Sequence, residues 1–338
     1  MVALPFHAKG LFMTRDVLSS KEGVGTHEVV PFVKDDLPPK AAIPWSRYRF
    51  MQKVAIPWAF ILPILLLHAL VVLLPAIQGV YYSFTEWSGF GAAEFIGLEN
   101  FRRIFFEDAD YGRALGNNLL WMVFFMTVPF AMALFAASFL SRVKTGGIIY
   151  RMLLFLPYVI PSVVVASIWR YLLSPRFGIG AQLSNIGIQG FDVAFLGRTD
   201  TALVSIAFAD NWHFWGFLMV LFLTAMQAIP TDLYDAAKVD GANRWQEFWN
   251  VTLPGIRPTV FFMLMMVMIW SFLVFEYVWL LTQGGPGGAS EVLGVVIFKN
   301  AFRRFDAGYA AAQGMTISFF ASIIVLIYLY LRKRGWDI

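Results

Sequence analysis

Six long apolar runs constrain this chain more than any other feature of its sequence. Each supplies the ~20 apolar residues that an α-helix needs to cross ~30 Å of hydrocarbon. The runs are Val54–Phe84, Asn117–Leu140, Ile148–Leu173, Thr201–Ile229, Thr259–Thr282 and Ala310–Leu331. Backbone polar groups in lipid must be satisfied internally, which only helices and closed barrels achieve, and the runs show no strand-like alternation. The sequence therefore predicts an all-α integral membrane protein with six transmembrane helices.

The composition excludes a soluble fold and several kinds of chemistry. Hydrophobic residues make up 59% of the chain and charged residues 14%, whereas average soluble domains have about 25% charged residues. A soluble core of this size cannot bury so much apolar surface, so we expect the bilayer to surround much of the chain. The absence of cysteine excludes disulfides and thiolate chemistry. No Gly-rich phosphate-binding loop occurs, so the chain is not expected to be an enzyme that hydrolyses ATP, and no cofactor or metal is expected in it.

Basic residues set the expected orientation. Arg47, Arg49 and Lys53 precede the first apolar run, and an Arg-Lys-Arg cluster at 332–334 follows the last. Lys and Arg near the ends of membrane helices favour the cytoplasmic side. The same rule explains the net charge of +4 without nucleic acid as a partner. We therefore predict that both termini lie in the cytoplasm, as an even number of spans requires.

The chain divides into a polar beginning and an apolar remainder. Residues 1–53 are polar, mixed in charge and interrupted by prolines, and we interpret them as a flexible cytoplasmic tail. They are not a secretory signal peptide, because the first apolar run begins too late. Residues 54–335 are expected to form one transmembrane domain.

The segment 230–258, between the fourth and fifth runs, is long for a helix connector and strongly patterned. Thr231 or Asp232 can cap a short helix that ends at Val239, and Gly241 follows where a left-handed residue would end it. A second amphipathic helix is expected over 243–251. Such a helix pair suits docking on a partner protein, but it could equally rest on lipid headgroups, and the residues alone leave both interpretations open.

This segment resembles the EAA loop of permease subunits of binding-protein-dependent ABC transporters. That loop has Glu-Ala-Ala, then Asp-Gly-Ala, then a distant Leu-Pro. The residues at matching positions are Asp235, Ala236, Ala237, Asp240, Gly241, Ala242, Leu253 and Pro254. Asp235 replaces the usual Glu, which keeps the charge and shortens its reach by one methylene group. The resemblance implies that these residues couple the chain to an ATPase.

Other stretches resemble the sugar-permease group, of the maltose and glycerol-phosphate type. They are Gly-Leu-Glu-Asn-Phe at 97–101, Leu-Pro-Tyr-Val-Ile-Pro at 156–161, Leu-Thr-Gln-Gly-Gly-Pro at 281–286 and Gly-Tyr-Ala-Ala-Ala at 308–312. The resemblance implies the ABC importer type I permease fold, with its core over residues 113–331 and the cytoplasmic coupling loop at 230–258. It also implies a bacterial or archaeal inner membrane as the location.

The same resemblance implies the partners and the route of the solute. A second permease subunit would complete a heterodimer, and an ATPase dimer would bind ATP and Mg²⁺. An extracytoplasmic solute-binding protein would deliver the solute, which would cross by alternating access through a site at mid-membrane. The solute itself is not named by the sequence: sugars, polyols, glycosides and phosphorylated or sulfonated sugar derivatives are all open.

Polar residues inside membrane spans are costly, which makes them candidates for the solute site. They occur in the fourth and fifth runs, where three-to-four-residue spacing places them on common helix faces with aromatic and aliphatic residues. The resemblance implies that these faces line a sugar path, together with an aromatic residue between the two prolines of the third run. The expected solute-lining residues are Tyr158, Asp210, Asn211, His213, Phe214, Phe217, Val267, Ser271, Val274 and Glu276.

Two of these residues also have a plainer interpretation. Asp210 and Glu276 could lie near the membrane edge and pair with neighbouring helices. Asp210 and Val274 stand where the maltose-type pattern has amides, so maltose itself is not the expected solute.

Two other classes of protein compete with the importer hypothesis. An ion-coupled secondary transporter could use Asp210, Glu276 or His213 as a proton site, but such folds usually show internal repeats, and none is found here. A structural membrane scaffold would not need a polar cluster within its spans. A secondary transporter also has no need of a loop that docks on an ATPase.

The predicted topology can be checked with reporter fusions. Fusions after Gly146 and at Asp240 should report the cytoplasm, and a fusion at Gly288 should report the opposite side, because an odd number of spans separates the last from the first two. A signal from outside at Asp240 would overturn the assignment, since the coupling loop could not then meet an ATPase.

Overall fold

The computed structural model describes residues 51–334, apart from 144, 189 and 191–192. The chain divides into two units, Met1–Leu65 and Leu66–Ile338. The described part of the first unit is helical and comprises the π-helix η1 (Met51–Ala55) and the start of α2 (Ile56–His68). Residues 1–50 of the expected tail lie outside the described residues, and 51–53 belong to this helix.

Four helices of the described chain are long and apolar enough to cross a bilayer. They are the continuous helix Lys53–Tyr82, which includes η2 (Ala69–Leu73) and α3 (Leu74–Tyr82), and α5 (Ala109–Leu140), α9 (Ala202–Gln227) and α16 (Ala307–Lys333). Two bent pairs of helices bring the candidate spans to as many as six. The expected all-helical membrane protein is therefore confirmed, with four to six candidate spans.

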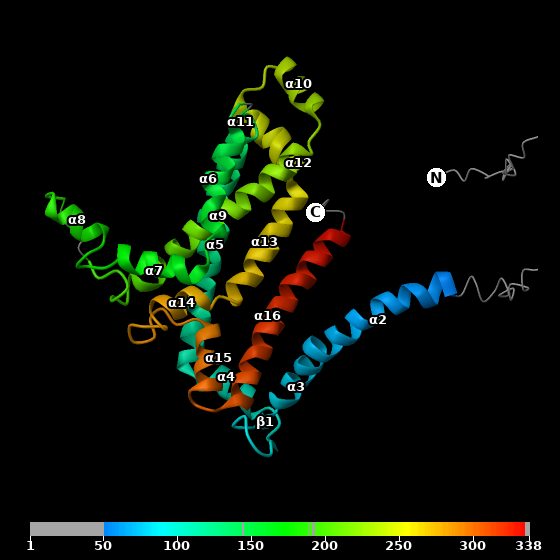
Figure 1. Cartoon of the computed structure of the whole chain (residues 1–338), viewed down its shortest axis with the longest axis vertical. Helices are drawn as coiled ribbons and strands as arrows, with labels where there is room; N and C mark the ends of the chain where they lie inside the picture. Colours follow the sequence, from blue (N-terminus) through cyan, green and yellow to red (C-terminus); the bar gives the residue numbers. More distant parts are fainter. Residues whose placement is uncertain (1–50, 144, 189, 191–192, 335–338) are drawn as a thin grey trace, which may run out of the picture. The chain divides into compact units, whose positions relative to one another are not determined.

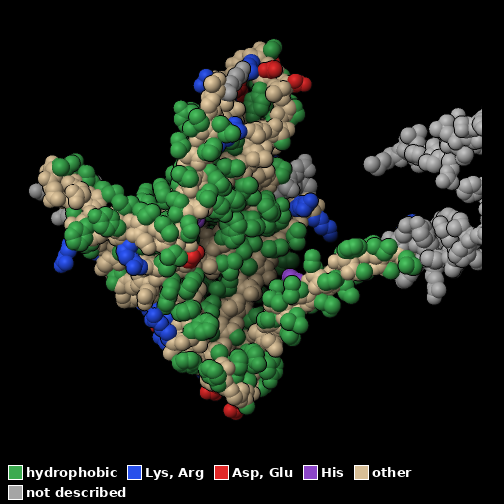
Figure 2. Space-filling model, viewed as in Figure 1, with side chains coloured by type: hydrophobic (Ala, Val, Ile, Leu, Met, Phe, Trp, Pro, Cys, Tyr) green, Lys and Arg blue, Asp and Glu red, His purple; other side chains and the backbone are tan. Residues whose placement is uncertain are grey.

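The body that begins at Leu66 is built around α5 and α9, which pack along each other (Figure 1). The helix α13 (Arg257–Phe272) packs against α5, and α6 (Gly147–Val159) packs against α9. Buried side chains such as Phe130 and Phe222 form the core between them. Figure 2 shows apolar side chains over much of the visible face of the body, while acidic and basic ones gather at its top, around α10 (Thr231–Val239). Helices that are apolar outside as well as inside suit a lipid environment.

The third apolar run does not form one straight helix. The helix α6 ends at Val159, and α7 (Ser162–Leu172) leaves it at an angle of 91°. Ile160 lies between them in an extended conformation, with ψ 131°. The residue before a proline disfavours the helical conformation, and Pro161 follows Ile160, so the break has a local cause.

The fifth run is also interrupted, at a point where the sequence holds neither proline nor glycine. The helix α13 ends at Phe272, and the short helix α14 (Glu276–Leu281) begins after three residues that continue neither helix. At its other end, α13 meets the helical segment Arg244–Gly255 at 72°.

Side chains from neighbouring helices satisfy the backbone groups that these breaks release. His213 Nε2 of α9 donates to the carbonyl oxygen of Ile160 at 3.1 Å. Asn118 Nδ2 of α5 donates to the carbonyl oxygen of Ser271 at 2.6 Å, and Asn118 Oδ1 accepts from the Leu293 backbone N–H at 2.8 Å. Each unmade backbone hydrogen bond in lipid costs several kcal/mol, so the breaks depend on these side chains.

Shorter elements connect the spans. A hairpin of β1 (Thr85–Glu86) and β2 (Glu94–Phe95) pairs Thr85 with Phe95, and α4 (Glu99–Phe106) follows it. The helix α8 (Ile179–Asn185) follows α7, and α15 (Leu293–Phe302) precedes α16.

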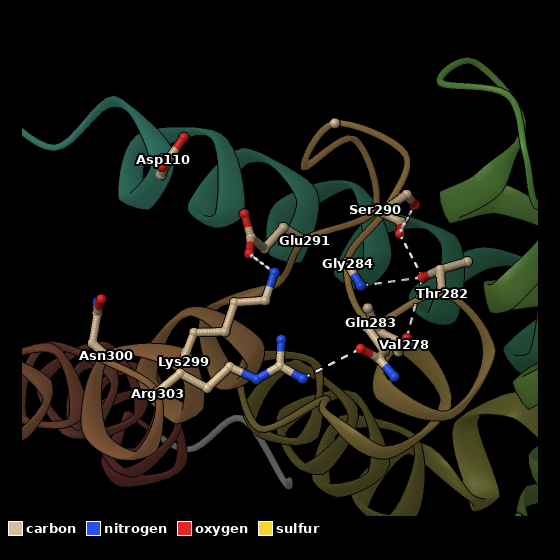
Figure 3. A network of polar contacts seen from close by, with 12 residues as sticks. Asp110, Val278, Thr282, Gln283, Gly284, Ser290, Glu291, Lys299, Asn300 and Arg303 are labelled. Atoms are coloured by element: carbon tan, nitrogen blue, oxygen red, sulfur yellow. Dashed lines mark hydrogen bonds and ion pairs between the residues drawn. The ribbon is translucent and has the colours of Figure 1, made fainter. Parts of the chain in front are cut away.

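Polar contacts fix the loop between α14 and α15 (Figure 3). Lys299 Nζ of α15 lies 2.5 Å from Glu291 Oε1, and this ion pair is largely shielded from solvent. The Thr282 and Ser290 hydroxyl groups are 2.8 Å apart and join the two ends of the loop. These contacts fix the conformation of the loop that follows α14.

A close approach of two backbones fixes how α6 lies on α9. A Cβ atom added at Gly216 in α9 would overlap the carbonyl oxygen of Leu154 in α6, whereas one added at Gly314 in α16 would meet nothing within 4 Å. The pairing of α6 with α9 therefore requires glycine at position 216.

We predict that Gly216→Ala lowers the melting temperature of the protein in detergent, because forcing the two helices apart costs roughly 1–3 kcal/mol. The control Gly314→Ala should leave the melting temperature unchanged or raise it slightly, since alanine is the better helix former. Equal melting temperatures for the two variants would show that α6 and α9 are not in close backbone contact.

Candidate functional site

A cavity of about 880 Å³ lies where the two broken helices meet α5 and α9. Its walls come from α5, α6, α7, α9, α13 and α14 and from the residues at both breaks. The lining residues are Trp121, Phe125, Tyr158, Val159, Ile160, Pro161, Ser162, Asp210, His213, Phe214, Val267, Trp270, Ser271, Leu273, Val274, Phe275, Glu276 and Tyr277. The breaks are therefore part of the cavity wall.

Aromatic rings form much of the wall. Trp121 and Phe125 of α5 stack with ring centroids 5.3 Å apart, and Phe214 meets Trp270 edge to face at 5.5 Å. Tyr158 stacks on Phe217 at 4.7 Å, which fixes the orientation of its ring. Rings held in this way offer flat apolar faces to a ligand.

Acceptor groups are concentrated on one part of the wall. Asp210 projects from α9 and Glu276 from the first residue of α14, and their charges interact. The Ser162 hydroxyl, at the start of α7, donates to Glu276 Oε1 and so connects the two helix breaks. Tyr277 is 5% exposed, and its hydroxyl has no hydrogen-bond partner among the described residues.

Most of the expected solute-lining residues do lie on this cavity. They are Tyr158, Asp210, His213, Phe214, Val267, Ser271, Val274 and Glu276. The plainer interpretation of Glu276 is partly right as well, because it pairs with a neighbouring helix through Ser162.

Asn211 and Phe217 are not among the described residues that line this cavity. Asn211 is 2% exposed and points to α5, where its Nδ2 lies 3.6 Å from the sulfur of Met132. It follows Asp210 by one residue, which turns it about 100° around the helix axis and away from the cavity. Phe217 lies behind Tyr158 and supports its ring.

Several lining residues were not expected from the sequence. Trp121 and Phe125 were not expected because residues 121–125 include no charged, amide or hydroxyl side chain, although their spacing of four indicates a common face. Trp270 and Tyr277 were not expected on the cavity. Trp270 follows Val267 by three residues in α13, a spacing that places both on one helix face, whereas Tyr277 lies in α14, beyond the break, where the spacing of α13 no longer applies.

The patterned segment forms the expected pair of short helices. The first helix is α10. The second is a continuous helical segment made up of α11 (Arg244–Glu247), η3 (Phe248–Thr252) and α12 (Leu253–Gly255). Gly241 has φ +78°, as expected for a left-handed residue after α10. The backbone N–H groups of Gly241 and Ala242 donate to the carbonyls of Lys238 and Ala237 at 3.1 and 2.9 Å. This is a Schellman ending.

One detail of the expected capping was wrong. Neither Thr231 nor Asp232 caps α10, because the helix begins at Thr231 and Pro230 occupies the capping position without a side-chain hydrogen bond. The second helix does carry a capping box, formed by Asn243 and Gln246.

An ion pair connects this helix pair to the end of α5, and a contact between two hydroxyl groups joins its two helices. Arg142, after α5, lies 2.8 Å from Glu247, whose side chain is 6% exposed. The Tyr234 and Thr252 hydroxyl groups are 3.0 Å apart and join the two helices. On α10, Asp235 pairs with Lys238 at 2.9 Å and raises the pKa of that ammonium group. Leu233 and Val239 of α10 are 52% and 87% exposed, so the described part of the chain leaves these apolar side chains largely uncovered.

Among the described residues, no cluster of three or more His, Asp or Glu side chains could hold a metal ion.

The chain matches a family model and is similar to known proteins. Residues 129–334 match the model described as "Binding-protein-dependent transport system inner membrane component". The "Probable ABC transporter permease protein YurN" of Bacillus subtilis is 33% identical over 84% of this chain and 98% of its own length. The "Diacetylchitobiose uptake system permease protein NgcF" of Streptomyces coelicolor is 31% identical over 84% of this chain and 85% of its own.

A solved structure shares the fold. A chain in the crystal structure of a bacterial ABC transporter involved in the import of the acidic polysaccharide alginate has a TM-score of 0.76 and 26% identity. The match covers 86% of this chain and 99% of that one. The protein is thus a membrane permease and not an enzyme, and it is part of a bacterial or archaeal ABC transporter that works with a binding protein. This chain belongs to the family of binding-protein-dependent transport system inner membrane components.

Proposed function

We propose that this permease imports a sugar or sugar-like solute and that the cavity between the two helix breaks is its half of the translocation path. The observation that carries the proposal is the combination of fixed aromatic faces with carboxylate and hydroxyl groups on one wall. Hydroxyl groups of a sugar donate to carboxylates, and the apolar face of a sugar ring packs on aromatic rings. A concave site with few, well-placed polar groups is the usual form of a ligand site.

Relatives support the same class of solute. A permease of similar sequence takes part in diacetylchitobiose uptake, and a permease of similar fold takes part in alginate import. Both solutes are saccharides. Membership in the family also argues against the ion-coupled secondary transporter that the sequence left open.

The coupling of transport to ATP hydrolysis is assigned to the helix pair at 231–255. The exposed face of α10, with Ala236 and Leu233, would dock on one subunit of an ATPase dimer. A second permease subunit would complete the path, and a solute-binding protein would deliver the solute from outside. The Arg142–Glu247 ion pair and the Tyr234–Thr252 contact would transmit a movement of the helix pair to α5 and α13 as one rigid unit.

Sugar uptake in cells that carry single variants tests this proposal. Gly241→Asp should abolish uptake and weaken copurification of the ATPase, because a left-handed residue other than glycine costs roughly 1 kcal/mol or more and displaces α10. Tyr158→Ala should lower uptake by about fivefold through the loss of one aromatic contact, and should retain the ATPase.

A matched control separates coupling from simple misfolding. Gly91 also has positive φ and open space around it, but it lies in the hairpin loop before α4, so Gly91→Asp carries the same strain away from α10. It should transport normally. Normal transport by Gly241→Asp with the ATPase retained would show that the helix pair only rests on the membrane surface.

A further inference from the structure

The formal charges on the cavity wall have one sign. Asp210 and Glu276 both line the cavity, and none of the described residues that line it is Lys or Arg. Building on the proposed sugar path, we propose that this acidic wall selects solutes by charge. A solute with a protonated amino group is favoured over its neutral form, and a solute with a carboxylate, sulfate or phosphate group is disfavoured.

The groups around the two carboxylates do not cancel their charge. Ser162 donates a neutral hydrogen bond to Glu276 and leaves the charge in place. Among the described lining residues, His213 alone could become a cation by gaining a proton, and its Nε2 already donates to the Ile160 carbonyl. Even a protonated His213 would offset only one of the two carboxylates.

A second observation indicates that a ligand group is missing from this wall. The hydroxyl of Tyr277 is buried, lines the cavity beside the His213 ring and has no partner. Its residue follows Glu276 directly, and its electrostatic interactions are with Asp210 and Glu276. A buried polar atom without a partner is uncommon in a native structure. An ammonium group has three N–H donors and could bind both carboxylates and this oxygen together.

The aromatic rings of the cavity also favour cationic solutes. Cations are attracted to the faces of tryptophan and tyrosine rings, and Trp270 and Tyr158 present such rings to the cavity. Because the surrounding lipid and apolar side chains have a low dielectric constant, a fixed charge acts over a longer distance here than in water. An anionic solute would meet the net negative charge of this wall in this medium.

The comparison with the alginate importer makes the inference specific. That transporter shares the fold and takes part in the import of an acidic polysaccharide. A uronate-rich solute is the class that the wall of this chain should reject. The shared fold therefore does not imply a shared solute.

The cavity charge can be measured without knowing the solute, because the chain contains no cysteine. A single cysteine is introduced as Val274→Cys, with Leu273→Cys as a second reporter in case the first variant folds poorly. Cationic and anionic methanethiosulfonate reagents of similar size are then applied to the complete transporter in nanodiscs. Each reaction rate is divided by that of the same reagent with free 2-mercaptoethanol.

We expect the normalised rate of the cationic reagent to exceed that of the anionic one by about tenfold or more. Adding Asp210→Asn or Glu276→Gln should lower this ratio severalfold, while Glu94→Gln, an equal change of charge in the exposed strand β2, should not alter it. A ratio near one, or a ratio unchanged by both cavity variants, would overturn the proposal. The result is independent of sugar uptake, so the two proposals can fail separately.

Discussion

Two interrupted helices in a membrane domain are possible only if the released backbone groups find new partners. Lipid offers none, and each unsatisfied group costs several kcal/mol. Here the carbonyl of Ile160 accepts from His213 of α9, and the carbonyl of Ser271 accepts from Asn118 of α5. The central pair of helices therefore supports both breaks. The rest of the site depends on this arrangement.

The two helix breaks form part of the cavity wall and place polar side chains on it. The turn at Pro161 directs Ser162 toward Glu276, and both Glu276 and Tyr277 lie on the cavity in the short helix that follows the second break. The local irregularity thus brings polar side chains together on one cavity wall.

The sequence predicted the helices, the patterned segment at 230–258 and eight of the eighteen residues that line the cavity, and the physical reasons for its failures are specific. The three-residue spacing was enough to predict that Asp210 and His213 share one helix face. The two prolines around Tyr158 indicated an irregular helix there. No residue near Phe272 indicates the break that follows it. The carbonyl group of Ser271 accepts a hydrogen bond from Asn118, which lies 153 residues away in the chain. Asn211 was misplaced because adjacent polar residues on a helix cannot all face the same way. Contacts between residues far apart in the chain, such as Asn118 and Ser271, cannot be read from one sequence.

The central claim is that the solute passes between the two helix breaks. The most direct measurement is a cryo-electron-microscopy structure of the complete transporter, with its binding protein, trapped with solute during turnover. Solute density should lie against the Tyr158 and Trp270 rings, within hydrogen-bond distance of Asp210 or Glu276. Solute density elsewhere, with lipid or side chains filling this cavity, would contradict the claim.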